Sequence, residues 1–295
     1  SERFIRSIGN LRNMKVAVIY HEDFGSKGHS VLKHRVKPSF EALTRSGLLE
    51  GDDVQVFEPE PAPLALVEKV HTPEHMERMI TESYNKMYHD VALLSAGGVI
   101  KAAEMVAKGE ADNAFAYTGT AGHHASPGSC WGFCYYNDVA ITIKRLREMG
   151  LDRFLIVDVD PHFGDGTRNF FGDDPNVYHI NFNHQQNSNS DGKKNNYDVG
   201  IGFDAKDDQF LSELESSMEM AKDFDFEICF VVFGHDSHAD DYGGFELTSE
   251  VYPKMAKIIK EAAGDKGVVF VLSGGSVPDV ASKAIPEVIA VLAGR

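Results

Sequence analysis

Acidic and histidine side chains directly follow an apolar, β-branched run in the middle of the chain. The run Phe154–Val157 leads into Asp158, Asp160 and His162. In extended backbone, alternate side chains point to the same side, so these three groups would crowd one face. Two carboxylates this close repel each other unless a cation compensates, which makes a bound metal the simplest interpretation.

A second apolar run, 228–233, leads into Gly-His-Asp236-Ser-His. The carboxyl ends of parallel strands meet at one edge of a sheet, so Asp236 can join Asp160 and His162 there. An O,N,O donor set that leaves open positions is typical of a catalytic metal. The imidazole and the small number of ligands favour one zinc ion per chain, with iron or cobalt as alternatives.

Two adjacent histidines, His123 and His124, follow a glycine-rich turn after the apolar run 113–117. A histidine pair at a strand end beside a metal suggests acid–base chemistry. Such rings need carboxylates to fix their tautomers, and Asp158 and Asp165 are the natural suppliers. We therefore predict that these two histidines and two aspartates form the catalytic group.

The scaffold that brings these strand ends together is indicated by apolar, β-branched runs alternating with helical patterns. This alternation is typical of a parallel sheet with helices on both faces. We expect at least six strands, at 15–20, 113–117, 153–160, 176–181, 227–234 and 267–273. We expect helices at 37–46, 73–84, 92–108, 137–149, 208–223, 249–263 and 278–292. The predicted fold class is α/β, with one open parallel sheet in a single domain over residues 1–295.

Segment 181–202 breaks this alternation because it is rich in Asn, Gln, Ser, Asp and Lys and has almost no apolar periodicity. We predict a long surface loop there, on the side of the sheet where ligands bind. It is either a binding loop or a solvated excursion of the chain.

The overall charge restricts the classes of partner. The chain has 295 residues and a formal net charge of −16, so its mean field repels polyanions. Direct binding of nucleic acid is therefore disfavoured, and a cationic or neutral small molecule fits better. Three cysteines are too few for a disulfide framework, which favours a reducing, cytoplasmic compartment. No apolar run or signal-peptide pattern argues for a membrane or for export, and a homo-oligomer stays open.

Several linked motifs resemble those of the histone deacetylase and acetylpolyamine amidohydrolase family in order and spacing. They are Gly122-His-His-Ala125, Gly132-Phe-Cys-Tyr-Tyr-Asn-Asp138, Asp158-Val-Asp-Pro-His-Phe-Gly-Asp-Gly166, Gly234-His-Asp-Ser237 and Leu272-Ser-Gly-Gly275, with weaker matches at 70–75 and 95–98. The resemblance implies the arginase-deacetylase fold. It also implies a zinc-dependent amidohydrolase that removes an acyl group from an N-acylated amine, such as acetyl-lysine or an acetylpolyamine.

The resemblance assigns roles to residues at matching positions. It gives the zinc to Asp160, His162 and Asp236, general base and acid catalysis to His124, and charge stabilisation to His123. It implies that Gly132 and Phe133 line the tunnel for the acyl-lysine stem. It also implies a monovalent cation, potassium, beside the zinc strand. The residues at that cation's ligand positions are Asp158, Asp160, His162, Asn181 and Phe182.

Two positions depart from the family pattern. Phe163 stands where the family has a second histidine, which leaves the ligand His162 intact. The family's Gly-Gly-Gly-Tyr reads Gly-Gly-Ser276-Val277, and valine has no donor to polarise the substrate carbonyl. Losing such a donor typically lowers the rate about 100- to 1000-fold. If Val277 faces the substrate, Val277→Tyr should raise activity; otherwise the residue packs in the turn before Pro278.

Other side chains could supply the missing donor, and the sequence does not choose among them. The candidates are Ser276, His235, His238, Tyr197 and Tyr242.

Two other functions stay open. The chain could be a catalytically weak or inactive protein that only binds an acylated ligand. It could also be a binuclear ureohydrolase, using His238, Asp240 and Asp241 as further ligands, although Phe163 and Gly164 do not fit that pattern. For Cys130 and Cys134, core packing is favoured over half of a metal-binding knuckle, because no second pair has matching spacing.

Overall fold

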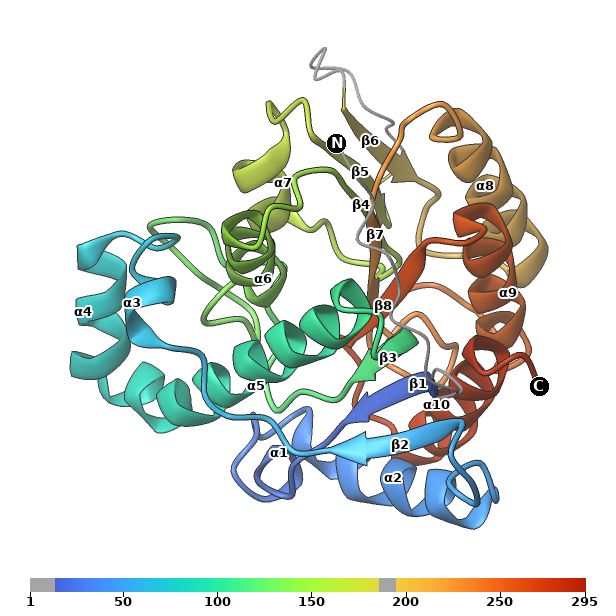
Figure 1. Ribbon diagram of the computed structural model, residues 1–295, viewed down its shortest axis with the longest axis horizontal. Helices are drawn as coiled ribbons and strands as arrows, with labels where there is room; N and C mark the ends of the chain where they lie inside the picture. The colour runs from blue at the N-terminus through green and yellow to red at the C-terminus, as the bar shows by residue number, and fades with distance from the viewer. Residues whose placement is uncertain (1–13, 186–194) are drawn as a thin grey trace, which may run out of the picture.

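The computed structural model describes residues 14–185 and 195–295. Its centre is an eight-stranded parallel sheet in the order β2-β1-β3-β8-β7-β4-β5-β6 (Figure 1). The strands are β1 (Met14–Ile19), β2 (Val54–Phe57), β3 (Ala111–Ala116), β4 (Phe154–Asp158), β5 (Val177–Asn183), β6 (Asn196–Gly200), β7 (Ile228–Phe233) and β8 (Gly267–Leu272). The predicted α/β class with an open parallel sheet is confirmed.

Helices cover both faces of this sheet. They are α1 (Asp23–Ser26), α2 (Val36–Arg45), α3 (Leu64–Val67), α4 (Pro73–Thr81), α5 (Ser83–Ala107), α6 (Asp138–Glu148), α7 (Asp165–Phe171), α8 (Asp207–Met220), α9 (Val251–Ala263) and α10 (Pro278–Leu292), with a 3-10 turn at Lys33–Arg35. In Figure 1, α5, α6 and α7 lie on one side of the sheet, and α2, α8, α9 and α10 lie on the other. Among the described residues, no helix combines the length and the apolar character needed to cross a lipid bilayer.

Alternation along the strands divides the apolar side chains between two cores. In β1, Val16 and Val18 belong to the core under α2, α8, α9 and α10, whereas Ala17 and Ile19 belong to the core under α5 and α6. Because both faces are buried, the strands read as nearly continuous apolar runs. That feature made the central strands predictable from the sequence.

The predicted loop 181–202 is wrong at both of its ends. Strand β5 continues to Asn183, and β6 pairs beside it with Asn181 opposite Asp198. The sequence conceals β6 because two of its buried side chains, Asn196 and Asp198, are polar. The Asn196 Nδ2 group donates to Asp198 Oδ1 at 2.8 Å. The middle of the predicted loop, 186–194, lies outside the described residues.

Strand β4 also ends two residues earlier than predicted, at Asp158. Beyond it the chain turns, and side-chain oxygens bond the backbone of the turn. The Asp160 N–H donates to Asp158 Oδ1 at 3.2 Å, and the His162 N–H donates to Asp160 Oδ1 at 3.0 Å. These turns position the side chains of Asp160 and His162 after β4. The extended backbone that the sequence analysis assumed does not continue there.

Candidate active site

The carboxyl ends of the adjacent strands β4 and β7 bring three candidate metal ligands together. Ligand atoms of Asp160, His162 and Asp236 all lie within 4.8 Å of one another. His162 Nδ1 is 2.9 Å from Asp160 Oδ1 and 3.1 Å from Asp236 Oδ2. In the described part of the chain this is the one group of three or more such residues that could hold a metal ion.

The chemistry of these three side chains fits a divalent cation. Both aspartates are buried, and apart from the contact with His162, neither carboxylate oxygen of Asp236 has a partner among the described residues. Burial, followed by repulsion from Asp160, raises the pKa of Asp236 to about 6. Burial opposes ionisation of His162, but the two carboxylates prevail and raise its pKa to about 11. The two buried carboxylates need a positive charge nearby. Without a metal ion they favour a proton on the imidazole, and a bound metal ion would balance their charge instead.

Glycines in two strand-end loops let the carboxylates approach each other. A Cβ atom at Gly274 would lie 2.2 Å from Asp236 Oδ2, and one at Gly234 would lie 2.5 Å from Asp236 Oδ1. Real Cβ atoms do not come that close to another atom, so any side chain there would displace the ligand. Gly274 and Gly234 therefore leave the space that the Asp236 carboxylate occupies.

We expect Gly274→Ala to weaken metal binding by at least an order of magnitude, because its methyl group would push Asp236 out of position. Competition titration against a chromogenic chelator measures this affinity. Gly25→Ala is the matched control, since its nearest neighbours would be 3.7 Å from the new Cβ atom. Equal metal affinities for both variants would contradict the argument.

The tandem histidines each pair with a carboxylate beside the metal ligands. His123 Nδ1 lies 2.8 Å from Asp158 Oδ2, and His124 Nδ1 lies 2.7 Å from Asp165 Oδ1. Asp165 is the first residue of α7, a short helix that the sequence analysis did not predict. The structure thus brings together the predicted pairs, and the catalytic roles of the four residues stay predictions.

The two rings differ in their electrostatic surroundings. Burial lowers the pKa of His124, and neighbouring His123 lowers it further, to about 4 despite the opposing Asp165. Burial also acts to lower the pKa of His123, but Asp158 and Asp160 outweigh it and raise the value to about 9. A neutral imidazole beside a cationic one suits a base with an electrostatic partner.

These groups line a cavity of about 170 Å³. Its lining comprises Ala121, His123, His124, Trp131, Gly132, Phe133, Cys134, Asp160, His162, Asp236, Tyr242 and Gly274. The predicted tunnel residues Gly132 and Phe133 therefore lie at the cavity, together with the metal group and both histidines.

Trp131 is a site residue that the sequence analysis missed. Its ring centroid lies 3.7 Å from that of His124, and its Nε1–H donates to Asp165 Oδ2 at 2.8 Å. The ring packs on the histidine and shares its carboxylate, so it fixes both. Its position in the only Trp-Gly-Phe step of the chain, next to a predicted tunnel residue, was the available signal.

Arg35 is a second residue that sequence reasoning missed, and it supports the site from behind. Its buried guanidinium donates to the carbonyls of Ser273 and Gly274. The same two residues donate to Asp160 Oδ2, through Ser273 Oγ and Gly274 N–H, each at 3.0 Å. Arg35 therefore fixes the loop that holds a metal ligand. Arg35 stands in the basic run 33–37, which is typical of a charged surface segment and gives no sequence signal for such a role.

We expect Arg35→Met to lower the free energy of unfolding by roughly 3 kcal/mol, because it leaves two buried carbonyls without charged donors. Urea denaturation monitored by circular dichroism measures the change. The control is Arg45→Met, whose side chain is 71% exposed. A variant as stable as the control would show that the loop does not depend on Arg35.

Comparison with known proteins agrees with this geometry. A family model described as histone deacetylase domain matches residues 29–292. The chain belongs to the histone deacetylase family. Family membership supports a hydrolase of the deacetylase type.

Individual relatives extend the match. The chain is 31% identical over 293 residues to a protein named "Probable deacetylase" from Archaeoglobus fulgidus, covering 89% of this chain and 81% of that protein. It is 32% identical over 206 residues to histone deacetylase 9 of Homo sapiens, covering 62% of this chain but only 20% of that protein. A crystal structure of the HDA15 HD domain superposes with a TM-score of 0.84 at 23% identity, covering 95% of this chain and 90% of that one, and shows the shared fold.

Val277, where the sequence analysis finds the larger departure from the family pattern, does not line the cavity. It precedes α10, its side chain packs against the main core, and its N–H donates to Asp241 Oδ2 at 3.1 Å. A substrate contact by Val277 is untested and stays a prediction.

The predicted potassium site is not tested by the structure, which shows only what two of its residues contact. Asn181 Oδ1 accepts the Gly164 N–H at 3.0 Å, and its Nδ2 donates to Asp198 at 3.2 Å. Phe182 is buried, and its ring lies 5.0 Å from that of Phe210. The monovalent cation at Asp158, Asp160, His162, Asn181 and Phe182 stays a prediction from the resemblance.

The further ligands of a binuclear ureohydrolase do not join the metal group. His238 contacts Ser249 at 3.2 Å and Asp240 at 3.7 Å, while Asp241 bonds the backbone before α10. Cys134 is buried, and its Sγ accepts the His124 N–H at 3.3 Å. These placements favour the mononuclear deacetylase arrangement.

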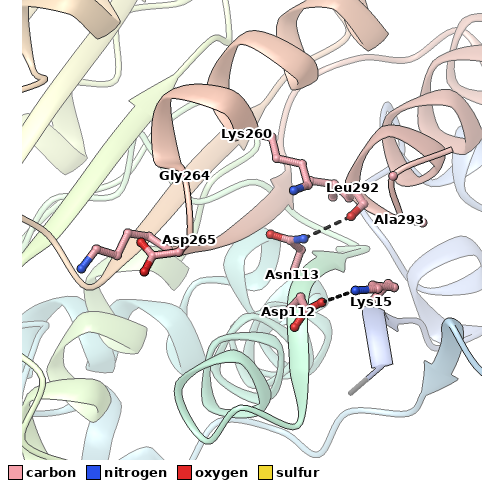
Figure 2. Close-up of a pocket in the computed structure, with 10 residues that line it drawn as sticks. Lys15, Asp112, Asn113, Lys260, Gly264, Asp265, Leu292 and Ala293 are labelled. Atoms are coloured by element: carbon pink, nitrogen blue, oxygen red, sulfur yellow. Dashed lines mark hydrogen bonds and ion pairs between the residues drawn. The ribbon is translucent and has the colours of Figure 1, made fainter. Parts of the chain in front are cut away.

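A larger cavity of about 500 Å³ lies at the opposite edge of the sheet, where β1 and β3 begin (Figure 2). Its lining includes Lys15, which pairs with Asp112 at 3.1 Å, and Asn113, which donates to the Leu292 carbonyl at 3.1 Å. It holds no histidine and none of the metal group. The smaller cavity is therefore the candidate active site.

Proposed function

We propose that this chain is a zinc-dependent amide hydrolase that removes an acyl group from an N-acylated amine such as acetyl-lysine or an acetylpolyamine. The observation that carries the proposal is the convergence, on one cavity, of the group Asp160, His162 and Asp236 with two histidine–aspartate pairs. The mixed oxygen and nitrogen donor set favours zinc. The chemistry that zinc supplies when bound is polarisation of a carbonyl and acidification of a water molecule.

His124 is suited to move the proton. Asp165 accepts from Nδ1, and Nε2 makes no hydrogen bond within the described residues, so this atom can take a proton from water and later give it to the departing amine. Trp131 packs against the ring and holds it in place. His123 lies next to the reacting groups, and its partner Asp158 favours the protonated ring.

The cavity and the charge of the chain support a linear amine as substrate. Aromatic rings of Trp131 and Phe133 line a volume of about 170 Å³, which suits an alkyl stem better than a bulky group. The net charge of −16 favours a cationic amine over an anionic ligand. All three cysteines are free, which supports a reducing compartment such as the cytoplasm.

The test is release of free amine from an acetyl-lysine peptide and from acetylated putrescine and spermidine by the zinc-loaded protein. We expect turnover of at least one of these classes and inhibition by a hydroxamate. A folded, zinc-loaded protein that binds the hydroxamate but hydrolyses none of the substrates would favour the alternative, a binding protein that has lost catalysis. A protein that neither binds the hydroxamate nor hydrolyses any of the substrates would contradict both the hydrolase and the binding-protein interpretation.

A further inference from the structure

One side chain in the cavity can supply the carbonyl donor that Val277 lacks. Of the five side chains that could replace the missing tyrosine, Tyr242 is the one that lines the cavity. Ser276 Oγ donates to Asp241 Oδ1 at 2.8 Å, so its hydrogen is already used. The Tyr197 side chain packs against the main core. His238 contacts Ser249 at 3.2 Å, away from the metal group.

The remaining candidate, His235, is fully buried behind the loop after β8. Its Nδ1 lies 3.3 Å from Asp241 Oδ2, and a Cβ atom at Gly275 would lie 2.4 Å from its ring. His235 therefore packs under the backbone of Gly275 and does not line the cavity. This leaves Tyr242.

The Tyr242 hydroxyl has an unused hydrogen. It accepts the Gly275 N–H at 2.9 Å, and among the described residues it makes no other hydrogen bond. A phenol oxygen that accepts one bond keeps its own O–H free to donate. A phenol of ordinary pKa is protonated at pH 7, and burial raises the pKa of Tyr242 further. The donor is therefore present at neutral pH.

The ring of Tyr242 lies close to one metal-ligand candidate and to one predicted tunnel residue. Its centroid lies 5.9 Å from that of the metal-ligand candidate His162 and 5.8 Å from that of Phe133. The hydroxyl touches the backbone of the Gly274-Gly275 step, two residues before Val277. It thus reaches the same loop from which the family's tyrosine would extend, but it comes from the loop after β7.

The two loops are braced together, which holds the hydroxyl in place. Asp241, adjacent to Tyr242, accepts the N–H groups of Ser276 and Val277 at 2.9 and 3.1 Å. On the other side of Tyr242, the Gly243 N–H donates to the Asp236 carbonyl at 2.8 Å. Tyr242 therefore lies in a loop that begins at a metal-ligand candidate and closes back onto it. Such preorganisation is what an oxyanion donor needs.

We propose that the Tyr242 hydroxyl donates a hydrogen bond to the acyl carbonyl oxygen of the substrate, in place of the tyrosine that the family carries at the position of Val277. This inference rests on the proposed amide hydrolysis. The bond strengthens as negative charge develops on the oxygen in the tetrahedral transition state. No covalent bond to Tyr242 is made or broken, so the hydroxyl keeps its proton throughout the reaction.

The test compares Tyr242→Phe with the wild type at equal zinc content. We expect kcat to fall about 100- to 1000-fold with little change in KM, because the interaction forms mainly in the transition state. Tyr197→Phe, which removes the hydroxyl of a tyrosine outside the cavity, should leave kcat unchanged. Val277→Tyr should alter kcat/KM less than threefold, because the donor position is already filled.

A binding measurement separates this role from a structural one. Calorimetry should show Tyr242→Phe losing about 100-fold affinity for a trifluoromethyl ketone analogue, whose hydrate mimics the tetrahedral state. The variant should retain zinc stoichiometry and affinity for the product amine, which lacks the carbonyl. Equal losses for both ligands, or loss of zinc, would mean that Tyr242 only supports the loop and would overturn the proposal.

The outcomes for the two proposals are distinguishable. A wild type that hydrolyses no N-acyl amine contradicts the proposed function itself. An active wild type whose Tyr242→Phe variant is equally active contradicts only the role of Tyr242. A tenfold or greater gain in Val277→Tyr would likewise show that the donor position is vacant in the wild type.

Discussion

Asp236→Ala is expected to bind no stoichiometric metal and to show no measurable amide hydrolysis. The substitution removes one of the three ligands that converge after β4 and β7. It leaves Asp160 and His162, which do not make a closed set around a cation. Elemental analysis of the purified protein measures the metal, and amine release measures turnover.

Asp240→Ala is the matched control for Asp236→Ala, because it removes a carboxylate four residues away whose side chain is 80% exposed. This control should retain one metal ion per chain and wild-type turnover. Removing Asp236 also relieves repulsion between buried carboxylates, so the variant should fold. Full metal occupancy in folded Asp236→Ala would show that the metal ligands lie elsewhere.

His124→Ala is expected to lower kcat by roughly 100- to 10,000-fold, the usual contribution of a positioned general base and acid. His124 is not a member of the metal group, so the variant should keep its metal within a factor of two. Single-turnover kinetics on the best amide substrate, at matched metal content, isolates the chemical step from release of product.

An exposed histidine provides the comparison for this second prediction. His34→Ala changes a side chain outside the cavity and should be as active as the wild type. If His124→Ala turned over substrate at the rate of His34→Ala, another group would have to carry the proton, and His123 would be the next to test.

The central strands and the groups at their ends could be predicted because both signals are local. Buried parallel strands are nearly continuous apolar runs, and an Asp or His directly after such a run lies at the ligand-binding edge. For Asp160, His162 and Asp236 this reasoning led to side chains that the structure places together. The assumed extended backbone beyond Asp158 was wrong, but turns produced the same convergence.

Other parts of the site depend on contacts between segments far apart in the chain. Arg35 reaches the loop after β8 across more than two hundred residues, and no local pattern marks that contact. Tyr242 was one of five equal candidates until the loop after β7 was seen to meet the loop after β8. Strand β6 was not predicted because two of its buried side chains, Asn196 and Asp198, are polar and bond to each other.

Removal and return of zinc tests the central claim most directly. The wild-type protein would be stripped with a chelator, checked for retained fold by circular dichroism, and assayed for amine release from acetyl-lysine and acetylpolyamine substrates before and after addition of one equivalent of zinc per chain. The account predicts no turnover in the stripped protein and full recovery at one equivalent. Turnover that persists in the folded, metal-free protein would contradict it.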